Sequence, residues 1–111
     1  VNAVTEEGVI INLDGTGNRI AGSLFGHKKV FYVFGTNKVC ENIEAGIWRT
    51  RNVAAPLNAI RLKCKTPCAV KGNRCYDCKS EERICNGLLI QYRKMSDIEA
   101  EAIIIDEELG L

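Results

Sequence analysis

The sequence has little of what membrane proteins, nucleic-acid-binding proteins and histidine-based enzymes require. It contains one histidine, His27, in a Gly-His-Lys turn, and its formal net charge at pH 7 is +1. A nearly neutral chain carries no general signal for nucleic acid or anionic membranes. The longest apolar runs, residues 30–34 and 102–105, are far shorter than the ~20 residues of a membrane span. The sequence also shows no Ser/His/Asp set and no paired catalytic carboxylates, so we assign no catalytic residue.

What is present fits one globular α/β domain. The 111 residues are 46% hydrophobic and 26% charged, a composition that allows a single core. The chain begins at Val1, and residues 1–7 show no strand pattern or helix cap, so we expect a piece of a longer protein that lacks its other half. No signal-peptide pattern is visible. We therefore expect a cytoplasmic protein whose six cysteines take part in metal or thiol chemistry rather than in secreted disulfides.

Four stretches predict strands. Residues 8–13 and 87–93 are short runs of β-branched and aliphatic residues, typical of strands. Residues 29–34 and 102–105 are almost continuously apolar, as expected for strands buried on both faces of a parallel sheet. The polar residues 95–100 predict a turn.

A helix is expected after residue 37, because apolar residues recur there every four positions. Asn37 is its predicted N-cap. Its buried stripe would consist of Val39, Ile43 and Ile47. Cys40 and Trp48 lie beside this stripe in the pattern, and we expect both to pack in the core.

Pro56 should interrupt this helix, because proline removes a backbone donor and clashes with the preceding turn. A second helix is expected over residues 54–62, with Leu57, Ile60 and Leu62 facing inward. The resulting order of elements predicts an α/β fold with a mostly parallel sheet flanked by helices, in one domain over residues 1–111.

The turn after the first strand is rich in glycine. It reads Asp-Gly-Thr-Gly-Asn-Arg over residues 14–19, and a helical pattern follows it. A strand, a glycine-rich turn and a helix together can present backbone N–H groups to an anion. A plain turn is the alternative, because Gly-x-Gly alone is a weak motif. Ligands of α/β sheets gather beyond the carboxyl ends of strands, so we predict a site for a small anion formed by Asp14, Gly15, Thr16, Gly17, Asn18, Arg19, Asn37 and Lys38.

A cysteine-rich segment spans residues 64–86. Its cysteines Cys68, Cys75, Cys78 and Cys85 have the spacing Cys-x6-Cys-x2-Cys-x6-Cys, and Cys64 precedes them. Four thiolates suit a structural zinc ion or an iron–sulfur cluster, and spacing alone does not separate the two. Nearby lysines and arginines outnumber the carboxylates and favour thiolates. Free thiols or disulfides are the alternative, because a second Cys-x2-Cys pair is missing.

Several separated motifs resemble one known family. They are residues 2–5 (Asn-Ala-Val-Thr), 14–19, 54–59 (Ala-Ala-Pro-Leu-Asn-Ala), 66–68 (Thr-Pro-Cys) and 83–86 (Arg-Ile-Cys-Asn). Together they resemble the LUD (lactate-utilisation) domain family, in its subgroup of small uncharacterised bacterial and archaeal proteins. The resemblance covers nearly the whole chain.

The resemblance implies a fold like that of CoA transferases and sugar-phosphate isomerases. It also implies a role in the utilisation of lactate or a related organic acid, beside iron–sulfur partner proteins. Under it, the glycine turn and Asn37-Lys38 lie where that superfamily binds phosphate-bearing or acyl ligands, and the four spaced cysteines match the subgroup's pattern. Cys40 and Cys64 do not belong to the pattern.

Three functions follow from these observations. The first is an organic-acid-utilisation protein that binds a small anion and a cysteine-held metal, with an oligomer possible. The second is a non-catalytic interaction module in which the metal only orders a loop. The third is an iron–sulfur redox component. In CoA-transferase chemistry a glutamate is the nucleophile, but nothing singles out Glu6, Glu7 or Glu44, and whether the protein is an enzyme stays open.

Overall fold

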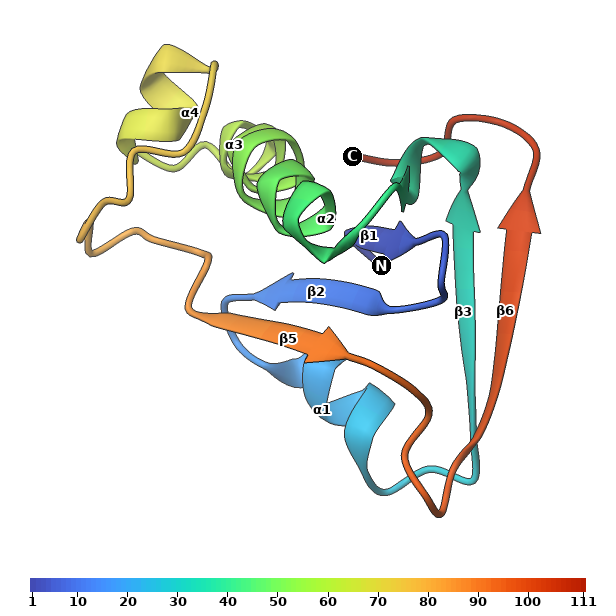
Figure 1. The fold of residues 1–111 in the computed structure, drawn as a ribbon. Helices are drawn as coiled ribbons and strands as arrows, with labels where there is room; N and C mark the ends of the chain where they lie inside the picture. The colour runs from blue at the N-terminus through green and yellow to red at the C-terminus, as the bar shows by residue number, and fades with distance from the viewer.

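A four-stranded mixed sheet and a separate two-stranded ribbon carry the fold (Figure 1). The computed structural model describes residues 1–111. The sheet has the order β4-β1-β2-β5, formed by β1 (Ala3–Thr5), β2 (Ile10–Asp14), β4 (Val39–Cys40) and β5 (Gly87–Gln91). β2 is antiparallel to both β1 and β5, and only β4 runs parallel to β1. The prediction of a mostly parallel sheet is therefore wrong for this sheet.

A tight turn explains the antiparallel pairing of β1 and β2. The backbone N–H of Gly8 donates to the carbonyl of Thr5, and that of Thr5 donates to the carbonyl of Val9. Gly8 has a φ of 88°, a left-handed conformation that glycine adopts without steric cost. A connection this short can join only antiparallel neighbours, because parallel strands need a long crossover. The strand at residues 3–5 was not predicted, because three residues are too few for a pattern.

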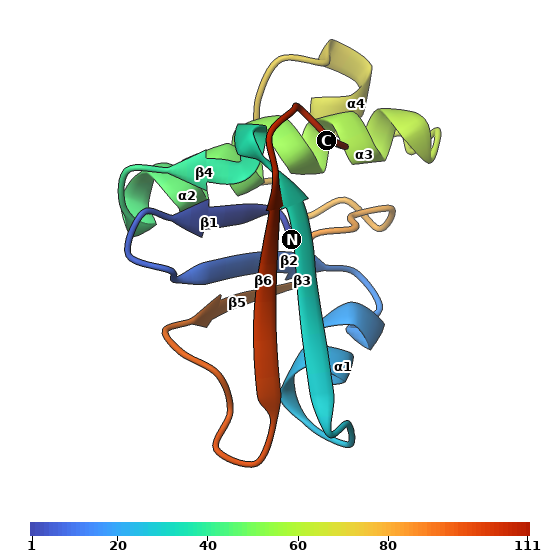
Figure 2. The same cartoon turned by 90° about the vertical axis from the view of Figure 1, so that its right-hand side faces the viewer.

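β3 (Lys29–Gly35) and β6 (Glu99–Ile105) form the parallel ribbon, which runs across the strands of the sheet (Figures 1 and 2). Tyr32 and Phe34 point inward and form the core cluster with Val4 and Ile10. The Tyr32 hydroxyl donates to Gln91 Oε1 at 3.0 Å and ties the ribbon to the sheet.

The outer face of the ribbon has no covering layer, so the prediction of strands buried on both faces is wrong. Phe31 is 57% exposed and Val33 is 53% exposed. β6 is exposed along nearly its whole length, and it begins at Glu99, inside the stretch for which a turn was predicted. A run of apolar residues does not show how many neighbouring layers are available to cover it.

One long helical rod packs on the sheet. It consists of α2 (Ile43–Arg49), the π-helical segment η2 (Thr50–Ala54) and α3 (Ala55–Arg61). Small buried residues, Gly46, Thr50 and Ala54, recur every four positions along it. A Cβ on Gly46 would lie 2.5 Å from Cδ1 of the fully buried Ile11. The rod therefore approaches the sheet through small residues, with glycine at the point of contact with Ile11.

The start of this rod differs from the prediction. Asn42, not Asn37, is the N-cap, and its Oδ1 accepts a hydrogen bond from the backbone N–H of Ala45 at 2.9 Å. Val39 lies in β4, and the 3₁₀ turn η1 (Thr36–Lys38) precedes it. Trp48 is 61% exposed and does not pack in the core.

Pro56 does not separate two helices. It lies in the first turn of α3, directly after η2, and is buried. Proline has no backbone N–H and its ring clashes with the preceding turn of a regular helix. The wider π-helical turn before Pro56 accommodates both effects. The predicted inward residues of this helix, Leu57, Ile60 and Leu62, are 41%, 43% and 49% exposed. Pro56 and Ala59 face inward instead.

The remaining elements are two short helices, α1 (Asn18–Leu24) and α4 (Pro67–Lys71). The predicted strand before the glycine turn, the helix after it and the strand at β5 are confirmed. None of the helices is both long and apolar enough to cross a membrane.

Candidate anion pocket and cysteine cavity

Asp14, the last residue of β2, organises the glycine-rich turn. Its Oδ2 accepts hydrogen bonds from the backbone N–H groups of Arg19 at 3.0 Å and Ile20 at 3.2 Å. Its Oδ1 accepts from Arg19 Nε at 3.2 Å. Burial alone would raise the pKa of the Asp14 carboxyl, but the Ile20 N–H and the Arg19 guanidinium outweigh it and lower the pKa. The donors at the start of α1 thus bind the chain's own carboxylate.

The end of the cysteine-rich segment holds this turn from the other side. The backbone N–H of Asn86 donates to the carbonyl of Asp14 at 3.0 Å, and Asn86 Nδ2 donates to the carbonyl of Gly15 at 3.1 Å. A Cβ on Gly15 would lie only 2.8 Å from the carbonyl oxygen of Ile84. Glycine is therefore required at position 15 for the two segments to approach.

A pocket of about 440 Å³ lies between this turn and the rod. Five of the eight predicted ligand-binding residues line it, namely Asp14, Gly15, Thr16, Arg19 and Lys38. The other three do not. Gly17 and Asn18 form the start of α1, and Asn37 accepts a hydrogen bond from the backbone N–H of Leu109 at 3.1 Å, which fastens the C-terminal segment.

Lys38 is the unusual charge in this pocket. The residue is 5% exposed, and its ammonium group has neither a hydrogen bond nor a carboxylate within ion-pair distance. Burial lowers the pKa of Lys38, and the neighbouring Arg49 guanidinium lowers it further. Arg49 donates to the main-chain oxygens of Asn37 at 2.7 Å, Asn2 at 2.8 Å and Leu111 at 3.5 Å, and no Asp or Glu carboxylate forms an ion pair with it.

The charged side chains of the pocket do not balance. Arg19, Lys38 and Arg61 line it, against the single carboxylate of Asp14. That carboxylate already binds Arg19. Lys38 and Arg61 are left without an anionic partner, because Arg61 donates only to the side-chain oxygen of Asn58, at 2.9 Å. A small anion would supply the missing charge.

Sequence reasoning missed the wall that α3 provides. Ala55, Asn58 and Arg61 of α3 line the pocket, together with Ala54 at the end of η2 and Ile84 from the cysteine-rich segment. Polar residues three apart, at positions 58 and 61, were a usable signal, because residues at this spacing share one face of a helix. This signal was overlooked because residues 54–62 were interpreted as a helix with an inward apolar face.

The four spaced cysteines surround one small cavity. Cys68 lies in α4, and Cys75, Cys78 and Cys85 lie in the irregular residues 72–86. All four line the same cavity, together with Arg51 and Arg83. Cys64 and Cys40 do not line it. Cys40 lies in β4 and is half-buried, and burial raises the pKa of its thiol.

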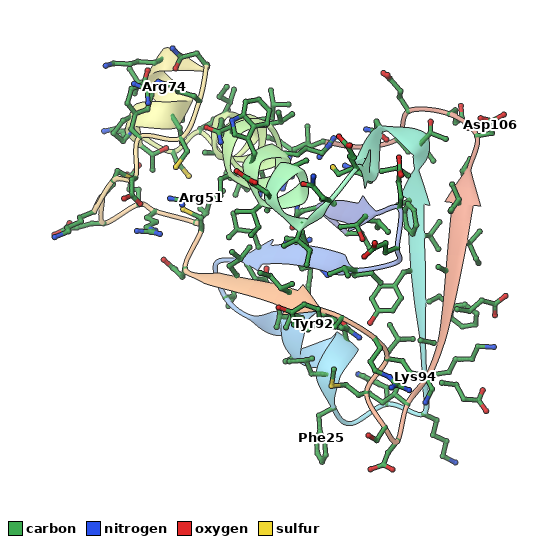
Figure 3. The ribbon with its side chains drawn as sticks, viewed as in Figure 1. Phe25, Arg51, Arg74, Tyr92, Lys94 and Asp106 are labelled. Atoms are coloured by element: carbon green, nitrogen blue, oxygen red, sulfur yellow. The ribbon has the colours of Figure 1, made fainter.

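Two arginines hold the cysteine loop in place. Arg51, in η2 of the rod, lies beside the loop (Figure 3) and donates to Asp77 Oδ1 at 2.8 Å and to Cys75 Sγ at 3.7 Å. Arg83 donates to the carbonyls of Cys78 at 2.9 Å and Cys85 at 3.0 Å. The interaction with Cys75 raises the pKa of Arg51. The cavity thus has positive charge beside its sulfurs, which suits thiolates.

The sulfurs share a cavity without meeting at one point. No three histidine, cysteine or acidic side chains are placed to hold a metal ion together, and all six cysteines are free of disulfides. The donor set of four thiols suits zinc or an iron–sulfur cluster, but the arrangement described here is not that of a formed tetrahedral site. The metal site stays a prediction.

The two cavities are neighbours. Leu13 and Ala55 line both of them. Ile84 lines the anion pocket and is followed directly by Cys85, which lines the cysteine cavity. A shift of the backbone at Cys85 would therefore move Ile84, which is part of the pocket wall.

Comparison with known proteins places the chain in one family. The model of the LUD domain matches residues 1–105. The match covers nearly the whole chain, so this protein belongs to the LUD domain family, as its motifs predict. No curated protein and no solved structure matches it.

Proposed function

We propose that this LUD-domain protein binds a small organic acid in the pocket between the glycine turn and α3. The observation that carries the proposal is the buried and unpartnered Lys38. A buried ammonium group without a partner is costly. An anionic ligand that enters the pocket would provide the partner, and its binding energy would include the relief of that cost.

The shape and charge of the pocket agree with such a ligand. Its volume of about 440 Å³ lies in the range of small-molecule sites. The ligand's carboxylate would accept hydrogen bonds from Lys38 and Arg61, and Asn58 would bind a hydroxyl or carbonyl group of the ligand. Asp14 and Arg19 would serve mainly to fix the turn, because they already bind each other.

The link to lactate or a related acid rests on the family. Family membership is an analogy for the substrate and does not supply a mechanism. It does narrow the first ligands to test, which are lactate, pyruvate, inorganic phosphate and CoA.

The second part of the proposal is that the four cysteines of the cavity hold a metal, either zinc or an iron–sulfur cluster. Its support is that Cys68, Cys75, Cys78 and Cys85 line one cavity with two arginines beside them. Residues 72–86 form no regular element, so the loop can close around an ion. The metal would order the loop and, through Ile84 and Asn86, the wall of the pocket.

The alternative is an interaction module without a small-molecule ligand. The observation that favours it is the uncovered outer face of the β3–β6 ribbon, where Phe31, Val33 and Ile103 are exposed. The two functions differ in what they predict for ligand binding, because an interaction module has no need of an anion in the pocket.

Calorimetric titration tests the anion site. We expect lactate, pyruvate or phosphate to bind, and neutral lactamide to bind at least tenfold more weakly than lactate. Lys38→Met should remove binding, whereas Lys28→Met, which changes an exposed lysine, should leave it unchanged. Equal binding by Lys38→Met and the native protein, or no binding of any of these anions, would rule out the proposed site.

A further inference from the structure

We propose that Lys38 is a nucleophilic lysine that forms an imine with a small 2-oxo acid in the anion pocket. The inference rests on the proposed function and names both the class of ligand and the reacting atom. It goes beyond anion binding, because a simple binding site needs the charge of the lysine and not its reactivity.

The amine of Lys38 lies at a covered position in the pocket wall. Lys38 lines the pocket while its residue is 5% exposed. Its Nζ lies 3.7 Å from the position that a Cβ on Gly110 would occupy, so the C-terminal segment covers it. Asn37, next in sequence, holds that segment through Leu109. Lys38 is thus largely shielded from bulk water and forms part of the pocket wall.

The charged groups around the Lys38 amine also matter for its reactivity. The Arg49 guanidinium is a neighbouring cation, and no Asp or Glu carboxylate forms an ion pair with the amine. Arg49 cannot move away easily, because it donates to the carbonyls of Asn37 and Asn2. Burial next to a fixed cation raises the neutral fraction of the amine, which is the form that attacks a carbonyl, whereas the protonated form binds the carboxylate of an incoming acid.

The pocket also has a group that can orient a 2-oxo acid. Arg61 has no anionic partner, and a guanidinium binds a carboxylate in two-point fashion. With its carboxylate on Arg61, a 2-oxo acid would hold its carbonyl carbon in the pocket that Lys38 also lines. A hydroxy acid binds in the same way but offers no carbonyl.

The proposed step balances without any further reactant. The Nζ lone pair attacks the carbonyl carbon, the two amine hydrogens leave with the carbonyl oxygen as water, and a C=N bond replaces the C=O bond. No electron is transferred, and hydrolysis returns the amine and the 2-oxo acid.

Reductive trapping tests this step. The full chain is incubated with pyruvate and sodium borohydride, and peptides are analysed by mass spectrometry. We expect one reduced pyruvate adduct on Lys38 and none when lactate replaces pyruvate. The matched variant is Lys38→Arg, which keeps the charge but cannot form an imine. It should retain lactate binding within about tenfold and lose the adduct, whereas Lys28→Met should keep it.

The outcomes separate this inference from the proposed function. Lactate binding together with no adduct on Lys38 would overturn the imine and leave the anion site intact. Adducts spread over exposed lysines, equally in the native protein and in Lys38→Arg, would also overturn it. An adduct on Lys38 that excess lactate suppresses would support both the imine and the shared site.

Discussion

The anion pocket and the cysteine cavity share Leu13 and Ala55 as a wall but differ in what holds their shape. The pocket is formed by the ends of regular elements, β2, α1, η1 and α3. The cavity is formed largely by residues 72–86, which have no helix or strand and depend on a few side-chain hydrogen bonds. The shape of the pocket is therefore set by regular backbone structure, whereas the shape of the cavity depends on side-chain contacts of an irregular segment.

This difference suggests how the two sites work together. Asn86 and Ile84 connect the cysteine loop to the turn at Asp14 and Gly15. If a metal orders the loop, it also steadies one wall of the anion pocket. The following predictions test where the two sites are separate and where they depend on each other.

The largest effect is expected for the cysteines. If the four cysteines of the cavity hold a metal, Cys78→Ser should lose it, because the substitution removes one of the four proposed ligands. Cys40→Ser and Cys64→Ser should keep it, because neither residue lines the cavity. Elemental analysis of protein purified without oxygen measures this, with zinc indicating a single ion and iron with sulfide a cluster. Equal metal content in all three variants would contradict the assignment.

A substitution at Gly15 should disturb both sites. Gly15→Ala puts a Cβ 2.8 Å from the Ile84 carbonyl oxygen, and overpacking against backbone costs about 1–3 kcal/mol. We expect a lower free energy of unfolding in urea and weaker lactate binding.

Gly22→Ala is the matched control for Gly15→Ala. Its Cβ would meet no atom within 4 Å, and in helix α1 it should stabilise by about 0.5–1 kcal/mol. If the two alanine variants have the same stability and affinity, the contact between turn and loop is unimportant.

Acid should weaken the turn through Asp14. The pKa of this carboxyl is lower in the folded chain, so its contribution is fully present above the unfolded pKa of about 3.9 and is lost as the pH falls through the folded pKa. At pH 7, Asp14→Asn should lower the free energy of unfolding by about 1.5–3 kcal/mol. The difference between the two proteins should shrink below about pH 4, and a difference that is constant with pH would exclude this role.

The smallest effect is expected for Asn86. Asn86→Ala removes one exposed hydrogen bond to the Gly15 carbonyl and should cost about 0.5–1 kcal/mol. Its informative readout is the coupling, namely the ratio of lactate affinities with and without bound metal. We expect this ratio to move toward one in the variant. An unchanged ratio would show that Asn86 does not connect the two sites.

The local secondary structure around the glycine turn could be predicted from the sequence. β2, the turn after it and α1 follow from a β-branched run, two glycines and a helical spacing within residues 8–25. Such patterns depend only on residues that are close in the sequence, so they can be interpreted without knowledge of the rest of the fold. The family was also readable, because its motifs are short and separate.

The sequence did not show which apolar residues are covered by a second layer, or which face of the helical rod packs on the sheet. Phe31 and Val33 are apolar in either case, and only the absence of a second layer leaves them exposed. Leu57 and Ile60 were expected to be buried, but the rod presents its small residues to the sheet instead, because Gly46 allows the closest approach to Ile11.

The sequence by itself determined the glycine turn, the four spaced cysteines and the presence of Lys38 beside a strand end. Only the tertiary structure decided that Lys38 is buried without a partner, that Arg61 from α3 faces the same pocket, and that the cysteine loop abuts Gly15. The physical reason is that local conformation depends on adjacent residues, whereas burial and charge balance depend on segments that lie far apart in the chain.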